Sequence, residues 1–236
     1  AGPLYGRRED VLAFARDLAA ADPSLPQDWI EAQLAQARRV AAVERAIMPP
    51  PAGTAKNWTA YHDRFVEPRR LQAGVAFWDQ HARWLAAAQA RWGVPPEIVV
   101  GIVGVETLYG RHTGSFRALD ALATLSFDFP SGRSDRSAFF REELGHLLRL
   151  ARREGVDPAS LKGSYAGALG WPQFMPGSWL RWAVDFDGDG HVDLHGNPAD
   201  VIGSVAHYLA AFGWRRDEPT HFAVAVPVDT RQRAAL

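Results

Sequence analysis

One glutamate stands in an otherwise apolar stretch of the sequence. Residues 97–110 read EIVVGIVGVETLYG, and helical spacing places four of them on one face: Val99, Ile102, Val103 and Glu106. Such an apolar face is expected to be buried. Burial disfavours a charged carboxylate and therefore raises its pKa. A carboxyl of raised pKa can protonate a glycosidic oxygen near neutral pH, so the pattern indicates Glu106 as a candidate general acid.

The same spacing also has a purely structural interpretation. Glu106 could pair with a nearby arginine, such as Arg111 or Arg117, inside the fold. Spacing alone does not separate an acid from an ion pair. Gly101 and Gly104 add a second feature, because a glycine inside a helix costs about 1 kcal/mol relative to alanine. They indicate that another backbone or a ligand approaches this helix closely.

A second group of acids follows the pattern of an EF-hand loop. Residues 185–193 read DFDGDGHVD, which places Asp185, Asp187 and Asp189 at loop positions 1, 3 and 5. His191 follows at position 7, where the backbone carbonyl is the ligand. Hard oxygen donors at this spacing are typical of a Ca²⁺ site.

This acidic loop departs from the EF-hand pattern at its closing ligand. Gly196 stands at position 12 instead of a glutamate, and the next carboxylate is Asp200. We therefore expect a longer metal loop, 185–200, closed by Asp200 from the start of the following helix. The alternative is an ordinary acidic turn, but four aspartates within residues 185–193 would repel one another without a cation. We expect a structural Ca²⁺ rather than Mg²⁺, which prefers a tight octahedron.

Both acidic groups need elements that hold them in place. Apolar residues recur at helical spacing along most of the chain. We expect helices at 8–21, from 26 onward, and at 68–92, 95–110, 116–125, 137–154, 176–184 and 199–212. Residues 48–57 read as a loop or linker, and 220–228 alternate like a strand. The sequence therefore predicts a mainly α fold.

Composition excludes several classes of protein and partner. Lys+Arg total 26 and Asp+Glu total 27, so a net charge of −1 gives no field for nucleic acid. No apolar run approaches the roughly 18 residues of a membrane span. The absence of cysteine excludes a disulfide scaffold and a thiolate metal site in this sequence. Nine Trp and five Tyr supply flat rings with polar tips, which sugar-binding grooves use.

Four long stretches together resemble one family, the membrane-bound lytic murein transglycosylase B family (glycoside hydrolase family 103). They are VVGIVGVETLYGR at 99–111, LDALATLSFDFP at 119–130, LKGSYAGALGWPQFMPGSWLRWAVDFDGDGHVDL at 161–194 and ADVIGSVAHYLAAFGW at 199–214. The resemblance implies a lysozyme-like helical catalytic core at 96–236, with an accessory N-terminal helical lobe at 1–95. It also implies cleavage of the β-1,4 bond between N-acetylmuramic acid and N-acetylglucosamine in peptidoglycan, leaving 1,6-anhydromuramyl ends.

The resemblance carries roles over to individual residues. Glu106 falls on the family's single acid/base, and the implied sugar contacts are Ser164, Tyr165, Gln173, Phe174 and Tyr208. The family's EF-hand-like loop falls on Asp185, Asp187, Asp189, His191 and Asp200, in agreement with the spacing. Because the C6 hydroxyl of the substrate acts as the nucleophile, this chemistry needs no second carboxylate. Asp120 and Asp128 are the candidates for one, and the alternative is that both are helix caps or structural acids.

Two other functions are compatible with this sequence. A murein hydrolase of the goose-lysozyme kind would use the same acid with water as nucleophile, and a non-catalytic peptidoglycan-binding domain would need only the groove. In each case we expect glycan strands as partner, a periplasmic location and a monomer. Any anchor to the outer membrane would lie outside this sequence.

Overall fold

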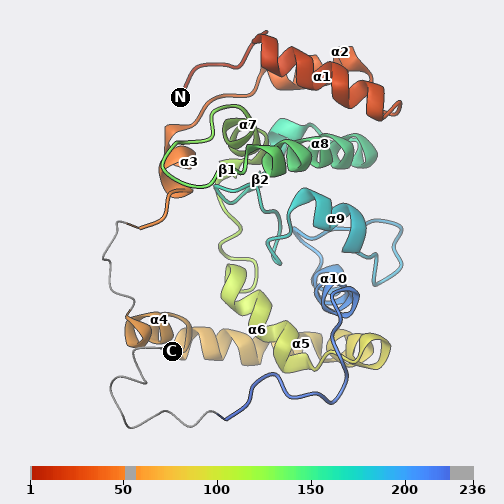
Figure 1. Cartoon of the computed structure of the whole chain (residues 1–236). Helices are drawn as coiled ribbons and strands as arrows, with labels where there is room; N and C mark the ends of the chain where they lie inside the picture. The colour runs from red at the N-terminus through yellow and green to blue at the C-terminus, as the bar shows by residue number, and fades with distance from the viewer. Residues whose placement is uncertain (1, 51–56, 224–236) are drawn as a thin grey trace.

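The computed structural model describes residues 2–50 and 57–223, and this part of the chain is mainly helical (Figure 1). The predicted mainly α class is therefore confirmed. The elements, in chain order, are α1 (Glu9–Ala21), α2 (Gln27–Ala35), α3 (Ala41–Ala46), α4 (Trp58–Phe65), α5 (Pro68–Trp92), α6 (Pro96–Thr107), β1 (Phe116–Arg117), α7 (Ala118–Phe127), α8 (Ser137–Glu154), the 3₁₀ helix η1 (Pro158–Ser160), β2 (Lys162–Gly163), α9 (Pro176–Trp182) and α10 (Pro198–Ala211).

The helices pack as two groups (Figure 1). In one group α7 packs along α8, with α1 and α2 paired above them; in the other, the long helix α5 packs on both α6 and α10. α9 contacts α8 and α10 and so links the groups. Every residue from Ala118 to Ser126 is buried, which makes α7 the centre of the first group.

The predicted boundary between lobe and core falls between α5 and α6. These two helices pack directly on one another, and α5 also packs on α10. α5 therefore supports the helix that carries Glu106, although it belongs to the predicted lobe 1–95. The division into 1–95 and 96–236 stays a prediction.

Several short elements were not indicated by the sequence pattern, although the short helix α9 was. α3 and α4 have only 6 and 8 residues, too few to display a clear helical repeat. The antiparallel pair β1–β2 joins Phe116 to Gly163 and Arg117 to Lys162. Of the strand expected at 220–228, residues 220–223 form no strand and the rest lie outside the described residues. Residues 51–56 of the expected linker also lie outside them.

Candidate active site

Glu106 projects from the last turn of α6. Pro95 and Pro96 start this helix, because proline's fixed φ suits the first helical position. The helix ends one residue after Glu106, and the left-handed conformation follows at Leu108, Tyr109 and Gly110. For leucine and tyrosine this conformation costs about 1–2 kcal/mol per residue. Packing around this turn must therefore hold Leu108 and Tyr109 in the left-handed conformation, whereas Gly110 adopts it without strain.

The predicted burial of Glu106 is wrong. Val99 and Val103 are buried and Ile102 is half-buried, but Glu106 is exposed at the end of this face. The physical reason is its place in the final turn, where α6 leaves the core. Nearby protein still displaces enough water to raise the pKa of the Glu106 carboxyl above its ordinary value of 4.5. The predicted direction of the shift therefore holds, with desolvation as its cause.

Glu106 does not form the ion pair with Arg111 or Arg117 that was the structural alternative to a role as an acid. Arg117 lies 3.4 Å from the carboxylate of Asp120 and donates to the carbonyl of Gln36. Within residues 2–50 and 57–223, no ion pair or side-chain hydrogen bond reaches the Glu106 carboxylate, from Arg111 or from any other residue. Nothing in this part of the chain therefore opposes the rise in its pKa.

The loop between β2 and α9 carries four of the five predicted sugar contacts. Ser164 Oγ accepts hydrogen bonds from the backbone N–H groups of Ala166 (3.2 Å) and Ala168 (3.1 Å). Gln173 has a positive φ of 53°, and its Nε2 donates to the carbonyls of Gly170 (2.8 Å) and Thr113 (3.2 Å). Both polar side chains thus hold the shape of the loop.

This loop is tied directly to the turn that follows Glu106. Thr107 Oγ1 donates to the carbonyl of Trp171 at 2.9 Å and accepts from the N–H of Gly110 at 3.0 Å. Thr107 is buried, so these bonds are shielded from water. A Cβ atom on Gly110 would collide with the Trp171 ring, which explains the glycine there. Glu106 and the loop therefore form one connected structure.

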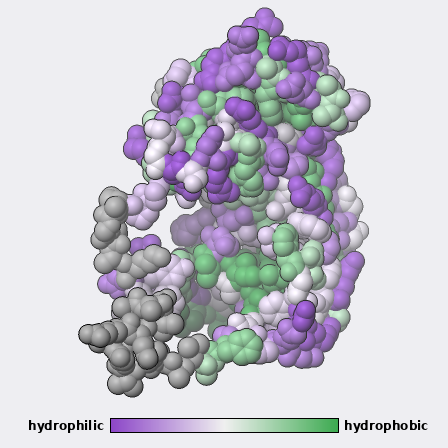
Figure 2. Space-filling view, in the orientation of Figure 1, coloured by the Kyte–Doolittle hydropathy of each residue, from purple (hydrophilic) through white to green (hydrophobic). Residues whose placement is uncertain are grey.

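The predicted aromatic contacts differ in exposure. Tyr165 is exposed, whereas Phe174 is buried and its ring lies 5.2 Å from that of Tyr208 on α10. Tyr208 is half-buried, and its ring centroid lies 4.5 Å from that of the exposed Phe212, with the two rings tilted against each other. The burial of Phe174 favours a packing role, while Tyr165 and Tyr208 keep accessible surface. Figure 2 shows one face of the molecule, which is hollowed between the two helix groups and has hydrophobic residues gathered beside the hollow.

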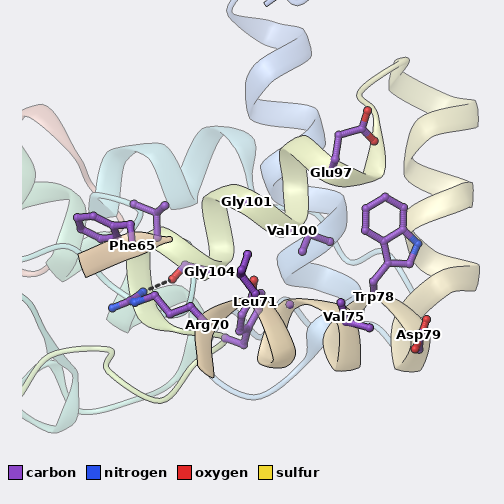
Figure 3. Close-up of a pocket in the computed structure, with 13 residues that line it drawn as sticks. Phe65, Arg70, Leu71, Val75, Trp78, Asp79, Glu97, Val100, Gly101 and Gly104 are labelled. Atoms are coloured by element: carbon purple, nitrogen blue, oxygen red, sulfur yellow. Dashed lines mark hydrogen bonds between the residues drawn. The ribbon is translucent and has the colours of Figure 1, made fainter. Parts of the chain in front are cut away.

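A separate apolar cavity of about 490 Å³ lies between α5 and α6 (Figure 3). Leu71, Val75 and Trp78 of α5 face α6 across it and remain exposed. Of the two glycines expected to allow a close approach, Gly104 meets the Tyr109 hydroxyl, whereas Gly101 has open space around it. None of the predicted sugar contacts lines this cavity. Sequence reasoning missed Tyr109, although glycine spacing on α6 was a signal for it.

Asp120 and Asp128, the two candidates for a second catalytic carboxylate, form hydrogen bonds and ion pairs within the first helix group. Asp120 is buried, lies beside Arg117 and accepts from the N–H of Arg38. Asp128 accepts from the Tyr5 hydroxyl and from Arg8, both at 2.8–2.9 Å. Both acids therefore hold the N-terminal segment on α7.

The acidic loop brings three carboxylates together. Oxygens of Asp185, Asp187 and Asp200 all lie within 4.8 Å of one another. Asp200 is buried, and both desolvation and the neighbouring Asp187 and Asp185 charges raise its pKa, although the N–H groups of Phe186 and Asp193 oppose this. Since no cationic side chain pairs with them in the described part of the chain, this oxygen-only donor set fits a hard metal cation.

Two predicted ligands lie outside this group of three. Asp189 and His191 are exposed, and Asp189 Oδ1 accepts from the N–H of His191 at 2.8 Å. Asp185 meanwhile accepts N–H bonds from Gly188, Asp189 and Gly190, which lower its pKa. The loop is therefore wound around Asp185, and Asp200 reaches it from α10 as expected. The roles of Asp189 and His191 as ligands stay predictions.

Comparison with known proteins gives consistent results. Residues 7–236 match the family model described as the transglycosylase SLT domain. The chain is 48% identical over 189 residues to membrane-bound lytic murein transglycosylase B of Escherichia coli (strain K12), covering 77% of this chain and 51% of that protein. It thus spans about half the length of that curated relative.

Two solved structures are similar over most of the described fold. The first is Escherichia coli lytic transglycosylase Slt35 in complex with calcium, with 42% identity, a TM-score of 0.83, and coverage of 92% of this chain and 67% of that one. The second is SltB3 from Pseudomonas aeruginosa in complex with NAG-anhNAM-pentapeptide, with 33% identity, a TM-score of 0.77, and coverage of 92% and 56%.

Proposed function

The chain belongs to the transglycosylase SLT domain family, and on that premise we propose that it is a lytic transglycosylase of peptidoglycan. Its reaction is cleavage of the β-1,4 bond between N-acetylmuramic acid and N-acetylglucosamine, with a 1,6-anhydro ring closed on the muramic acid. SltB3, a relative with the same fold, is known in complex with a ligand that contains an anhydro sugar.

The observation that carries this proposal is the environment of Glu106. Its carboxyl has a raised pKa, is exposed to the solvent side of α6, and has no cation beside it within residues 2–50 and 57–223. A carboxyl that keeps its proton at higher pH and is accessible to a ligand can act as a general acid. Glu106 then donates its proton to the leaving glycosidic oxygen.

The second half of the reaction uses the same residue as a base. Once the glycosidic bond has broken and the first sugar has left with the proton, the ionised Glu106 takes the proton of the C6 hydroxyl, and the C6 oxygen then bonds to the anomeric carbon. The N-acetyl oxygen of the substrate stabilises the positive charge that develops there. The engagement of Asp120 and Asp128 with arginines supports a single-acid route over the two-carboxylate arrangement of ordinary glycosidases. A tethered hydroxyl can outcompete water, since effective molarities reach about 10⁵ M or more.

The β2–α9 loop and α10 form the rest of the proposed sugar site. Ser164, Tyr165, Gln173 and Tyr208 contribute hydroxyl, amide and ring surfaces for the glycan. Phe174 supports the Tyr208 ring from below rather than contacting the sugar at length, because it is buried. The ties from Thr107 to Trp171 keep this surface in register with Glu106.

For the acidic loop we propose a structural Ca²⁺ held by Asp185, Asp187 and Asp200, with Asp189 and the carbonyl of His191 completing the ligand set. The relative Slt35 is known in complex with calcium. When bound, the ion would neutralise the clustered carboxylates and fix α10, which carries Tyr208. No catalytic step passes through it.

We place this activity in the periplasm, where peptidoglycan is found. No helix in the described ranges is long and apolar enough to cross a membrane. We propose that the protein works on glycan strands as a monomer.

Product analysis tests the proposed function against its two competitors. We expect mass spectrometry of purified murein digested by the protein to show fragments with 1,6-anhydromuramyl ends. Reducing ends would instead indicate a hydrolase of the goose-lysozyme kind, with water as nucleophile. Binding to murein without any released fragment would indicate a non-catalytic glycan-binding domain.

A further inference from the structure

Tyr109 lies three residues after Glu106 and turns back against the helix that carries it. The backbone is left-handed at Leu108 (φ 50°), Tyr109 (φ 56°) and Gly110 (φ 82°). Neither leucine nor tyrosine favours this conformation. Contacts made by the side chains must therefore hold the reversal, and Tyr109 makes the most specific of them.

The hydroxyl end of Tyr109 occupies a slot between α5 and α6. A Cβ atom built on Gly74 of α5 would lie 2.6 Å from the Tyr109 hydroxyl oxygen, and one built on Gly104 of α6 would lie closer still. Both glycines stand inside helices, where alanine is the better helix former. The two glycines therefore lower the helix propensity of α5 and α6, but they leave the space that the Tyr109 side chain fills.

Two further contacts fix the slot and the ring. The Tyr109 ring stacks on buried Phe77 of α5, with the ring centroids 5.0 Å apart. Arg70 Nη1 donates to the carbonyl of Gly104 at 2.7 Å, the same carbonyl that accepts from the N–H of Leu108 (Figure 3). The end of α6 is thus joined to α5 at both its backbone and its side chains.

We propose that Tyr109 is a positioning residue, whose ring in the slot of Gly74 and Gly104 sets the direction in which the last turn of α6 presents Glu106. The Glu106 carboxylate makes no hydrogen bond or ion pair within residues 2–50 and 57–223, so the backbone of that turn alone directs it. Thr107 ties one side of the turn to Trp171, and Tyr109 ties the other side to α5. The inference rests on the proposed acid/base role of Glu106.

Filling the slot tests this proposal. Gly104→Ala places a methyl group where the Tyr109 hydroxyl lies, and Gly101→Ala is its matched control, because a Cβ there meets open space on the same helix. We expect Gly104→Ala to lower kcat on the order of tenfold to a hundredfold with little change in KM, since small displacements of a catalytic group have effects of this size. Gly101→Ala keeps the wild-type kcat.

A titration of Glu106 in the absence of glycan tests the positioning role independently of protein stability and of catalytic activity. The Glu106 carboxyl is followed by NMR in ¹³C-glutamate-labelled protein without glycan, with Glu106→Gln to assign the signal. We expect the pKa of Glu106 to change in Gly104→Ala and Tyr109→Ala, but not in Gly101→Ala or Tyr109→Phe. Combining Gly104→Ala with Tyr109→Ala should be no worse than Tyr109→Ala alone, because both remove the same contact.

The possible results have distinct meanings. A folded Gly104→Ala or Tyr109→Ala variant with wild-type titration and kcat would overturn the positioning role. If Gly104→Ala does not fold, Tyr109→Leu supplies the same comparison with the slot left open. An altered Glu106 titration in a protein whose wild type releases no murein fragment would support positioning while rejecting the proposed function.

Discussion

Glu106 and Asp200 are both carboxyls whose pKa the fold raises, but the fold raises them by different means. Desolvation by nearby protein is the cause at Glu106, and no like charge contributes there. At Asp200 desolvation is again the largest cause, and the charges of Asp187 and Asp185 add to it. The first arrangement leaves a single acid that can give and take a proton. The second concentrates negative charge that a cation would relieve.

The difference explains why the two regions are built so differently. A proton donor for a large substrate needs an open side, and Glu106 is exposed. Asp200, which we propose as a metal ligand, is instead buried at the start of α10, although its neighbour Asp187 is exposed.

The largest effect should come from removing Glu106, the proposed proton donor. We expect Glu106→Gln to reduce murein cleavage by roughly 10²- to 10⁴-fold, the usual contribution of general acid–base catalysis. The melting temperature should hardly change, because the Glu106 carboxylate makes no hydrogen bond or ion pair in the described ranges. Release of murein fragments and thermal unfolding measure the two properties. Substantial residual cleavage would mean that another residue is the acid.

Removing calcium is expected to change the stability of the protein, whereas Glu106→Gln is expected to change its activity. Saturating Ca²⁺ should stabilise the folded protein by about 2.7 kcal/mol at a concentration one hundred times the dissociation constant. Thermal unfolding with and without a chelator measures this, and Asp187→Asn should abolish the difference while keeping the side chain's shape. Glu106→Gln is the control and should retain the full response. An identical melting curve in Ca²⁺ and chelator would remove the metal from the acidic loop.

The acidic loop and the surroundings of Glu106 also differ in how far the sequence could predict them. Asp185, Asp187 and Asp200 lie within sixteen residues of one another, so their spacing alone indicates a shared site. The long helices, such as α5 and α8, were also predictable, because 25 and 18 residues display many helical repeats. α3 and α4, with 6 and 8 residues, contain too few helical repeats for such a pattern to show.

The surroundings of Glu106 could not be predicted in the same way. They are assembled from α5, α6 and the β2–α9 loop, and the loop lies far from both helices in the sequence, so no periodicity reports such contacts. Helical spacing placed Glu106 on the correct face but could not show that α6 ends directly after it, leaving the side chain exposed. The same limit hid Tyr109, since its slot needs a glycine from each of two helices.

A smaller effect is expected from a substitution in the proposed sugar-binding loop, and it should differ in kind from the effect of replacing Glu106. Ser164→Ala removes an acceptor for the N–H groups of Ala166 and Ala168, so we expect a loss of about 1 kcal/mol in unfolding free energy. Glycan affinity should fall as the loop loosens, while the pH dependence of cleavage stays unchanged. Ser160→Ala is the control, since its hydroxyl lies exposed on η1. A shift in the pH profile would show that Ser164 acts on Glu106 directly.

The smallest effect concerns the pH dependence of stability. Because the pKa of Glu106 is higher in the folded state than its ordinary value of 4.5, the folded state binds its proton more tightly than the unfolded state does. Stability therefore falls as pH rises from about that value through the folded-state pKa, and Glu106→Gln should lack this part of the slope. The exposure of Glu106 keeps the difference small. Urea unfolding of both proteins at several pH values between about 4 and 7 measures it. Parallel curves would mean that water reaches Glu106 as freely in the folded protein as in the unfolded chain, and the contrast with Asp200 would then rest on charge alone.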